Sequence, residues 1–255
     1  MTTVCVIQAR INSTRLPRKI LADICGKTML ERVKERVKQC TGISDVFVSF
    51  SGNSFEHRLV GEQILMSGFD ESDVLTRIYH YATHPRHGTP DAILRVTADC
   101  PLFDPDWADN LIRLATSADL HYAYIEVDVP QIEGQSFRFP EGLDCEFISM
   151  EALEAAFKEA TELADREHVT PWISRNWERF QKGSITPSLD YSGLKWSVDT
   201  QADLDFVRAV YKELSGIDFR MNDVIDLLTS NPELLVINGQ TWRPEWMTGK
   251  ATRDH

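Results

Sequence analysis

Short apolar runs alternate with amphipathic segments along most of the chain. At residues 4–9 the run VCVIQA, with its β-branched residues, indicates a buried strand. At 28–40 apolar residues recur at helical spacing, and Thr28 followed by Glu31 is the signature of a capped helix start. Strands are predicted at 4–9, 46–49, 92–98, 119–127, 143–148 and 194–198. Helices are predicted at 28–40, 55–67, 73–84, 107–117, 149–163, 165–180, 200–214 and 221–230.

Strands that alternate with helices of this length are typical of βαβ units. In such units a mostly parallel sheet is covered by helices on both faces. Because no repeat or linker interrupts the pattern, we predict a single α/β domain over residues 1–237. The segment 128–142, rich in proline and glycine, is expected to form a lid or a small subdomain, and residues 238–255 a loosely held tail.

The overall charge limits the classes of partner. The chain of 255 residues has a formal net charge of −12. Nucleic-acid binding needs a broad face of lysine and arginine that neutralises phosphates, so we expect no nucleic-acid partner. A local basic site for a small anion remains compatible with this balance.

Cysteine usage and hydropathy indicate the compartment. The five cysteines are widely spaced and form no CxxC pair, which favours free thiols in a reducing environment. The first residues show no charged-then-apolar leader, and nowhere do 18 apolar residues follow one another. We therefore expect a cytoplasmic protein with no membrane partner.

Positive charge gathers in the loop that follows the first predicted strand. Ligands of α/β sheets bind beyond the carboxyl ends of strands, where this loop is expected to lie. Arginine offers a fork of donors to phosphate and lysine a compact charge. The loop is neither GxxxxGK[ST] nor GxGxxG, so side chains rather than a glycine nest would hold the phosphates; the alternative is a solvated basic loop. The candidate phosphate ligands are Arg10, Ser13, Thr14, Arg15, Arg18 and Lys19.

Carboxylates end two of the predicted strands. Asp99 follows the strand at 92–98 in RVTADCP, and Asp199 follows the strand at 194–198 in WSVDT. Mg²⁺ prefers one or two protein carboxylates, with phosphate oxygens and water completing its shell. The alternative for each aspartate is a turn or helix cap. Asp104 and Asp106, in DPD before a helix, are expected to cap rather than bind metal.

Two further stretches carry polar residues suited to an acceptor. In FPEGLDCEF, Asp144 and Glu146 share one face of the predicted strand because alternate residues do so. In DREHVTP, Glu167 and His168 are neighbours. His168 would position an acceptor or act as general base, since its ordinary pKa lies near neutrality; a structural role is the alternative.

Five motifs occur in a fixed order along the chain: IQAR-x2-STRLP-x-K, TADCPL, P-x-GLDCE, REHVTP and SVDT-x2-DL. Together they resemble the cytidylyltransferase family, which activates acidic sugars such as neuraminate and 3-deoxy-octulosonate. Within that family the chain is most similar to the SpsF-like branch, named for spore-coat polysaccharide biosynthesis. The resemblance runs from about residue 3 to about residue 212.

The resemblance implies a GT-A-type, Rossmann-like nucleotidyltransferase fold with CTP as donor and Mg²⁺ as cofactor. CMP would pass to an acidic sugar or phosphorylated small-molecule acceptor, with release of pyrophosphate, in a homodimer. It implies catalytic roles for Arg10, Arg15, Lys19 and Asp99, and metal binding by Asp99 and Asp199. The nucleotide-binding positions it implies are Gln8, Ala9, Arg10, Ser13, Thr14, Arg15, Lys19, Arg77 and Arg95.

Two stretches depart from the family pattern. After the second predicted strand, SFSGNSFE stands in place of a TS-type segment and an aspartate, and RLPGK reads RLPRK here, with Arg18 in place of glycine. Either the loop keeps its shape and gains a phosphate or acceptor contact, or Arg18 points to solvent, which we favour. Two other functions remain open on the same fold. A GT-A glycosyltransferase would release a nucleotide rather than pyrophosphate, and a non-catalytic nucleotide-binding protein of a biosynthetic cluster would show no turnover.

Overall fold

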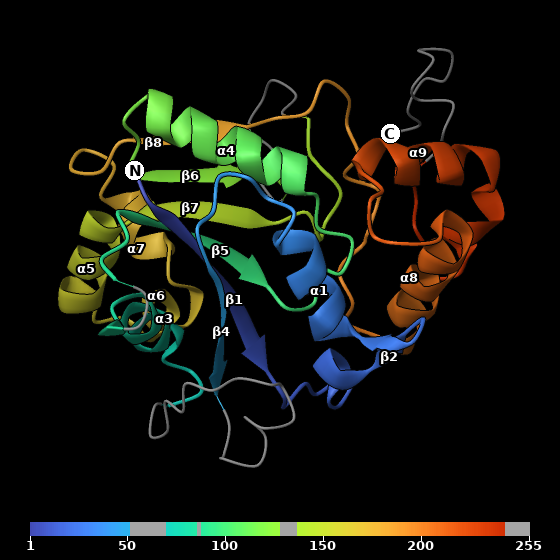
Figure 1. Ribbon diagram of the computed structural model, residues 1–255, viewed down its shortest axis with the longest axis horizontal. Helices are drawn as coiled ribbons and strands as arrows, with labels where there is room; N and C mark the ends of the chain where they lie inside the picture. The colour runs from blue at the N-terminus through green and yellow to red at the C-terminus, as the bar shows by residue number, and fades with distance from the viewer. Residues whose placement is uncertain (52–69, 86–87, 128–136, 243–255) are drawn as a thin grey trace.

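The computed structural model describes residues 1–51, 70–85, 88–127 and 137–242 (Figure 1). Within them lies a six-stranded sheet of order β4-β1-β5-β7-β6-β8, in which β7 runs antiparallel to its neighbours β5 and β6 and the other pairs are parallel. The predicted α/β fold with a mostly parallel sheet is confirmed. The strands are β1 (Thr3–Arg10), β4 (Val46–Ser51), β5 (Ala92–Thr97), β6 (Tyr122–Ile125), β7 (Cys145–Ser149) and β8 (Lys182–Ile185).

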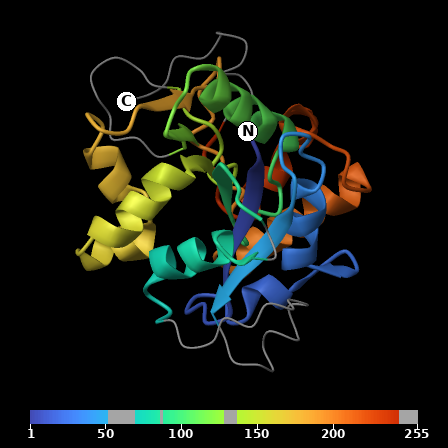
Figure 2. The same cartoon turned by 60° about the vertical axis from the view of Figure 1, so that its left-hand side comes forward.

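Helices cover both faces of the sheet, and Figure 2 shows helices on either side of the strands. In β1, Cys5, Ile7 and Ala9 enter one apolar cluster, while Val4 and Val6 enter the other. Burial on both sides explains why this strand is apolar without a break. The first cluster is closed by α1 (Met29–Val37), α4 (Pro105–Ser117), α8 (Gln201–Leu214) and α9 (Met221–Ser230). The second is closed by α3 (Val74–Ala82), α5 (Met150–Glu159), α6 (Leu163–His168) and α7 (Pro171–Arg175).

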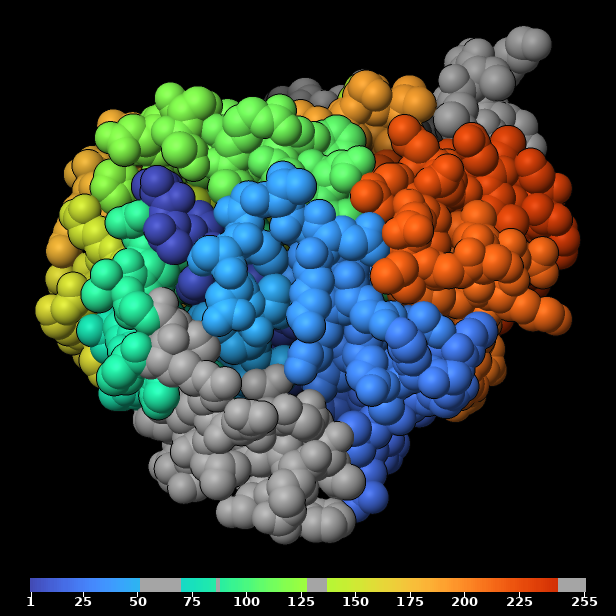
Figure 3. Space-filling view, in the orientation of Figure 1, coloured from blue at the N-terminus to red at the C-terminus, as the bar shows by residue number. Residues whose placement is uncertain are grey.

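Segments from the early and late parts of the chain pack against each other on one face. In Figure 3 the blue region, with α1 and the hairpin of β2 (Asp23–Ile24) and β3 (Lys27–Thr28), lies against the orange and red α8 and α9. The short helix η3 (Pro232–Val236) follows α9 and packs on it. None of the helices in the described part of the chain is long and apolar enough to cross a membrane.

Several helix starts use the capping residues expected from the sequence. Thr28 caps α1 and forms a reciprocal capping box with Glu31, as predicted. Asp104 accepts hydrogen bonds from the amides of Asp106 and Trp107 at the start of α4, which confirms it as a cap. Its other oxygen accepts from the Met221 amide at 2.5 Å, so the cap also ties α4 to α9.

The predicted strand at 194–198 is wrong. This segment forms only an isolated bridge, between Lys195 and Glu141. Its amides bond to two different segments: Trp196 and Ser197 donate to the Glu141 carbonyl, whereas Val198 donates to the Asp99 carbonyl at 2.9 Å. A short segment whose amides bond to two different neighbours does not form a continuous ladder of hydrogen bonds with either of them.

Other elements differ in extent from the prediction. The helix expected at 165–180 is broken into α6 and α7, because Val169 takes a φ of 72° between them. The edge strand β8 was missed, since KGSI has no apolar run. The strand predicted at 119–127 is shortened to β6. The helix predicted at 55–67 and most of the 128–142 segment lie outside the described residues.

The beginning of the expected tail is packed rather than loose. Trp242 is buried, and the side-chain amide of Asn238 donates to the Lys195 carbonyl and to an Asp203 carboxylate oxygen, both at 3.1 Å. Among the cysteines, all reduced, only Cys25 is exposed.

Candidate active site

The first loop connects β1 to η1 (Lys19–Leu21) and closes on itself. The Arg18 amide donates to the Ile11 carbonyl at 3.2 Å, and Arg18 has a left-handed backbone with φ of 57°. Glycine takes this conformation at least cost, which explains the glycine expected from the family pattern. The loop keeps its shape here with an exposed arginine at that position. Its closure places Lys19, the next residue, in a buried position.

Lys19 joins the two aspartates that the sequence placed at strand ends. Its ammonium group donates to Asp99 Oδ2 at 2.7 Å, to the Val198 carbonyl at 2.8 Å and to Asp199 Oδ1 at 3.1 Å. A lysine ammonium has three donors, and all three are used here. Both carboxylates therefore lie at one edge of the sheet, bridged by a cation that is only 5% exposed.

Asp199 is not the cap of α8. Thr200 takes that place and forms a capping box with Asp203, which leaves the Asp199 carboxylate to other partners. These are Lys19, Arg15 at 3.0 Å and Lys195 at 3.1 Å. Burial alone would raise the pKa of Asp199, but the hydrogen bonds from Lys19 and Lys195 outweigh it and lower that pKa to about 2.

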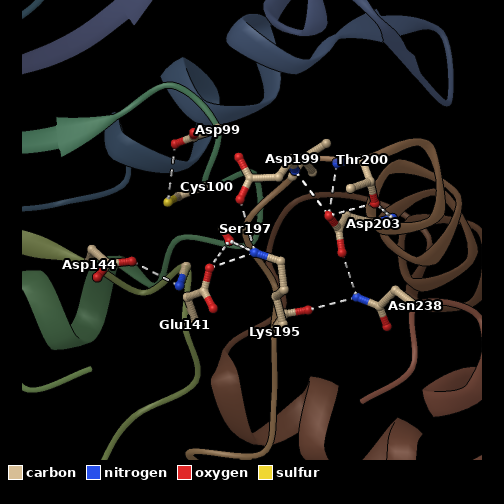
Figure 4. Close-up of polar contacts among 12 residues, drawn as sticks. Asp99, Cys100, Glu141, Asp144, Lys195, Ser197, Asp199, Thr200, Asp203 and Asn238 are labelled. Carbon is tan, nitrogen blue, oxygen red and sulfur yellow. Dashed lines mark hydrogen bonds and ion pairs between the residues drawn. The ribbon is translucent and has the colours of Figure 1, made fainter. Parts of the chain in front are cut away.

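Lys195 is a site residue that the motifs of the sequence did not reveal. Its ammonium group contacts Glu141 Oε1 at 2.6 Å, Ser197 Oγ at 2.8 Å and Asp199 Oδ2 (Figure 4). In LKWSVD the polar residues alternate with the buried Trp196 and Val198. This period of two puts Lys195, Ser197 and Asp199 on one side of an extended segment, and it was the available signal.

Two clefts meet at this edge. The first-loop cleft, of about 480 Å³, is lined by Gln8, Ala9, Arg10, Lys19, Arg77, Arg95, Glu167 and His168 among others. The acidic cleft, of about 810 Å³, is lined by Asp144, Glu146 and further carboxylates. Arg95, Thr97 and Asp99 line both. The predicted phosphate ligands Ser13, Thr14 and Arg15 line neither cleft, and Arg15 reaches the site through Asp199.

Arg95 separates the two clefts. Its guanidinium donates to Gln8 Oε1 at 2.9 and 2.7 Å and pairs with Glu146 on the other side. Glu146 also accepts from the hydroxyls of Tyr122 and Thr170, each at 2.7 Å. The predicted acceptor residue Glu146 thus has both oxygens engaged by protein groups. We call Gln8, Arg95 and Glu146 the Arg95 bridge.

The predicted acceptor residues are divided between the clefts. Glu167 and His168 are exposed on α6 and line the first-loop cleft, whereas Asp144 lies in the acidic cleft. A turn at Val169, where the Thr170 amide donates to the His168 carbonyl at 2.9 Å, directs the chain away after His168. Nothing in REHVTP signalled a positive φ at a β-branched residue, so the sequence did not predict this placement.

Arg77 is held firmly on the floor of the first-loop cleft. It is 2% exposed and donates to Ser49 Oγ at 3.3 Å and to the Glu71 carbonyl at 3.2 Å. Burial lowers the pKa of its guanidinium. Its position fits a fixed positive charge beneath a ligand in this cleft.

Asp144 is held at the start of β7 by a tight crossing. Its carboxylate accepts from the Gly142 amide at 2.9 Å. Gly142 has a φ of +105°, and a Cβ there would lie 2.4 Å from the Ser197 nitrogen. Burial, with the nearby charges of Asp99 and Glu141, raises the pKa of Asp144 to about 6.

The residues present fit a magnesium ion in one respect. Asp99 and Asp199 each offer a carboxylate, and the ammonium group of Lys19 bridges the two. Asp99 lines both clefts. Burial is the main cause of the raised pKa of Asp144, and the charges of Asp99 and Glu141 raise it further; a divalent cation at Asp99 would relieve this electrostatic part. The described residues contain no cluster of three or more side-chain ligands, so phosphate oxygens and water would supply the rest of an octahedral shell.

Comparison with known proteins decides the family. The sequence model of the family described as Cytidylyltransferase matches residues 4–233. The chain belongs to the cytidylyltransferase family. As a member of this family it is a nucleotidyltransferase, which confirms the resemblance and the enzyme class expected from the motifs.

Relatives of this cytidylyltransferase include the spore coat polysaccharide biosynthesis protein SpsF of Bacillus subtilis, 24% identical over 89% of this chain and 94% of that protein. A cytidylyltransferase from Leptospira borgpetersenii has a TM-score of 0.80 and 24% identity, covering 95% of this chain and 99% of that one. A CMP:2-keto-3-deoxy-manno-octonic acid synthetase complexed with CTP has a TM-score of 0.61 and 20% identity, covering 84% and 100%. These two structures confirm the nucleotidyltransferase fold.

Proposed function

We propose that this cytidylyltransferase transfers CMP from CTP to a hydroxyl group of a sugar acceptor and releases pyrophosphate. The observation that carries the proposal is the Lys19 bridge between Asp99 and Asp199, at the place where the two clefts meet. A nucleotide in one cleft and an acceptor in the other would bring their reacting atoms together at that junction.

The first-loop cleft suits the nucleotide. It lies beyond the carboxyl end of β1, the strand that has β4 on one side and β5 on the other. Ligands of α/β sheets bind at such a point, where the strand order changes direction. Four cationic side chains line the cleft: Arg10, Lys19, Arg77 and Arg95. Arg10 is exposed, whereas Arg77 and Arg95 are held by protein partners, so Arg10 is the side chain best able to follow a phosphate group.

Lys19 would support the reaction mainly by holding the carboxylates of Asp99 and Asp199 in place. All three of its donors are engaged, so a direct bond to phosphate would have to replace one of them. Its charge still lies at the edge of the first-loop cleft, where negative charge grows as pyrophosphate departs. Mg²⁺, which Asp99 and Asp199 would hold, supplies charge neutralisation of the phosphates when bound.

The protein's contribution is positioning and electrostatics. The acceptor oxygen forms a bond to the α-phosphorus while the bond to the pyrophosphate oxygen breaks, and the hydroxyl proton leaves to water. Arg10 lines the first-loop cleft and Arg15 pairs with Asp199, and both would stabilise the developing phosphate charge. Such preorganised donors are typically worth about 10²–10³ in kcat each.

The test is a pyrophosphate-release screen. CTP, UTP, GTP and ATP are each offered with Mg²⁺ and a panel of sugars, sugar acids and phosphorylated acceptors. The proposal predicts pyrophosphate with CTP and one acceptor class, and no release with Asp99→Asn. Release of a nucleoside mono- or diphosphate from a nucleotide sugar would instead show a glycosyltransferase, and nucleotide binding without any product a binding protein.

The similarity to SpsF supports a place in surface polysaccharide biosynthesis. We propose a cytoplasmic location, where CTP is made, and a homodimer, as the family resemblance implies. Fractionation of the producing cells tests the first. Sedimentation equilibrium of the purified chain, with one species at twice 29.1 kDa, tests the second.

A further inference from the structure

Residues 238–242, which we call the tail segment, lie against the start of the 194–198 segment. The Thr241 and Trp242 amides donate to the Gly193 carbonyl at 3.1 and 3.3 Å. Gly193 permits this approach, because a Cβ there would lie 2.7 Å from the Trp242 nitrogen. The match to the family model ends before the tail segment, so the family pattern assigns it no role.

The tail segment holds both main-chain groups of Lys195. The Lys195 amide donates to Gln240 Oε1 at 3.0 Å, and the Lys195 carbonyl accepts from the side-chain amide of Asn238 at 3.1 Å. The two tail side chains also bond to each other, with Gln240 Nε2 donating to Asn238 Oδ1 at 2.6 Å. Because Lys195 forms only an isolated bridge and no sheet ladder, side chains of the tail segment satisfy its main chain instead.

Asn238 also reaches the start of α8. Its side-chain amide donates to Asp203 Oδ1 at 3.1 Å. The other oxygen of Asp203 accepts from the amides of Asp199 and Thr200, at 3.1 and 2.9 Å. In Figure 4 a single amide, that of Asn238, therefore joins the Lys195 carbonyl to the carboxylate that holds the main chain of Asp199.

The side chain of Lys195 is committed to protein partners. Its three ammonium donors end on Glu141, Ser197 and Asp199 Oδ2, so none is left for a substrate. Lys195 lines neither of the two clefts. It holds one carboxylate oxygen of Asp199, while Lys19 holds the other. These contacts fit a residue that orients Asp199 rather than one that touches the reacting groups.

We infer that Asn238 and Gln240 are positioning residues of the active site, which act through Lys195 to hold the carboxylate of Asp199 at the junction of the two clefts. The importance of Asp199 for catalysis rests on the proposed function. Removal of a partner that orients a metal-binding side chain typically costs about 10–100-fold in metal affinity or activity. Loss of the tail contacts should therefore lower kcat, although neither tail side chain meets a substrate.

A spectroscopic test of this inference needs no turnover. Protons held in hydrogen bonds exchange slowly with water, so the ammonium group of Lys195 should give a resolved ¹H–¹⁵N signal at low temperature and slightly acid pH. Its absence in Lys195→Met assigns that signal. We expect Asn238→Ala/Gln240→Ala to abolish it and to leave the signal of Lys19 intact. Persistence of the Lys195 signal in the double variant, or its absence from the unaltered chain, would overturn the inference.

Pyrophosphate release then separates positioning from general support of the fold. The double variant should lower kcat about fivefold or more and leave the KM for CTP within about twofold, since the first-loop cleft is untouched. In a Lys195→Met background the same tail change should lower kcat less than about twofold, because the contact that it supports is already lost. Losses that multiply independently would contradict an action through Lys195.

Asn231→Ala is the matched control. Asn231 is half-buried, its side-chain amide donates to the Leu227 carbonyl at 3.0 Å, and it lines neither cleft. It should change neither the Lys195 signal nor kcat. If the double variant does not fold, Gln240→Ala alone, which keeps the bonds that Asn238 donates, takes its place in both experiments. No pyrophosphate release by the unaltered chain would count against the proposed function, and the Lys195 signal would then decide the inference by itself.

Discussion

The ammonium nitrogen of Lys19 lies 2.7 Å from Asp99 Oδ2, although 80 positions separate the two residues in the chain. This contact joins the first loop to the end of β5. It also holds a buried cation against the carboxylate that faces both clefts. The contact links folding to function, because the same pair closes the site and orders its charges.

Replacement of Lys19 by methionine tests this link. The variant leaves Asp99 and Asp199 without their shared cation, so we expect a loss of about 2–4 kcal/mol in the free energy of unfolding. We expect kcat to fall by about 10²–10³. Urea unfolding and pyrophosphate release measure the two effects. The double variant Lys19→Met/Asp99→Asn should regain part of the stability and none of the activity; recovered activity would contradict the assignment.

Asp199 should make stability depend on acid pH. Its pKa in the folded protein is about 2, below the ordinary 3.8 of an aspartate. The stabilisation is therefore complete above about pH 4 and is lost as the pH falls towards 2, with a magnitude of about 2 kcal/mol. Urea unfolding between pH 2.5 and 6 measures it. In Asp199→Asn this part of the pH dependence should vanish, and an unchanged slope would refute the ion-pair account.

Asp144 should have the opposite effect. Its pKa is raised from 3.8 to about 6, so the folded protein holds a proton that the unfolded chain has released. Its contribution to stability is present below pH 4 and is lost as the pH rises towards 6. Asp144→Asn should then stabilise the unliganded protein by about 1–3 kcal/mol at pH 8, with little effect at pH 4. Thermal unfolding at the two pH values checks the sign.

Gly142 should tolerate no side chain. Its φ of +105° opposes alanine, and so does the Ser197 nitrogen, which would lie 2.4 Å from an alanine Cβ. We expect Gly142→Ala to cost about 3 kcal/mol or more. Gly26→Ala is the control, because Gly26 has a φ of +85° but nothing within 4 Å of the place a Cβ would take. A cost of about 1 kcal/mol is expected there. Equal costs would show that the close crossing contributes nothing.

Arg18→Gly should restore the glycine of the family pattern without loss. The left-handed backbone at Arg18 disfavours arginine, and its side chain is exposed. We expect the free energy of unfolding to rise by up to about 1 kcal/mol, since relief of strain exceeds the added entropy of the unfolded chain. Activity should stay within twofold. A tenfold loss of kcat/KM would show instead that Arg18 contacts a substrate.

The parts of the fold set by local pattern were predictable. The unbroken apolar run of β1 and the capping box at Thr28 follow from burial and from local hydrogen bonding, which the sequence carries directly. The edge strand β8 was missed because none of its residues is fully buried and KGSI has no apolar signal. The segment 194–198 has the pattern of a strand, yet its amides bond to two separate segments, a tertiary arrangement that no periodicity encodes.

The site was predictable where chemistry follows a strand end. Asp99 follows β5, and its place at this edge of the sheet follows from the end of that strand. Asp199 reaches the same edge from an extended segment that is not a strand, and Lys19 joins the two carboxylates. His168 and Asp144 were both predicted to serve the acceptor, but they line different clefts, and the turn with a positive φ at Val169 directs the chain away after His168. Lys195 was not predicted because it precedes the SVDT motif and belongs to none of the five motifs. Its alternation with Ser197 and Asp199 was the available signal.

The Arg95 bridge allows the two substrate specificities to diverge separately. Among the described residues, only Arg95, Thr97 and Asp99 line both clefts. Substitutions among residues that line only the acidic cleft would leave the lining of the first-loop cleft intact. A lineage with this architecture can therefore change one cleft by point mutation while the other keeps its lining, so the two clefts can evolve at different rates.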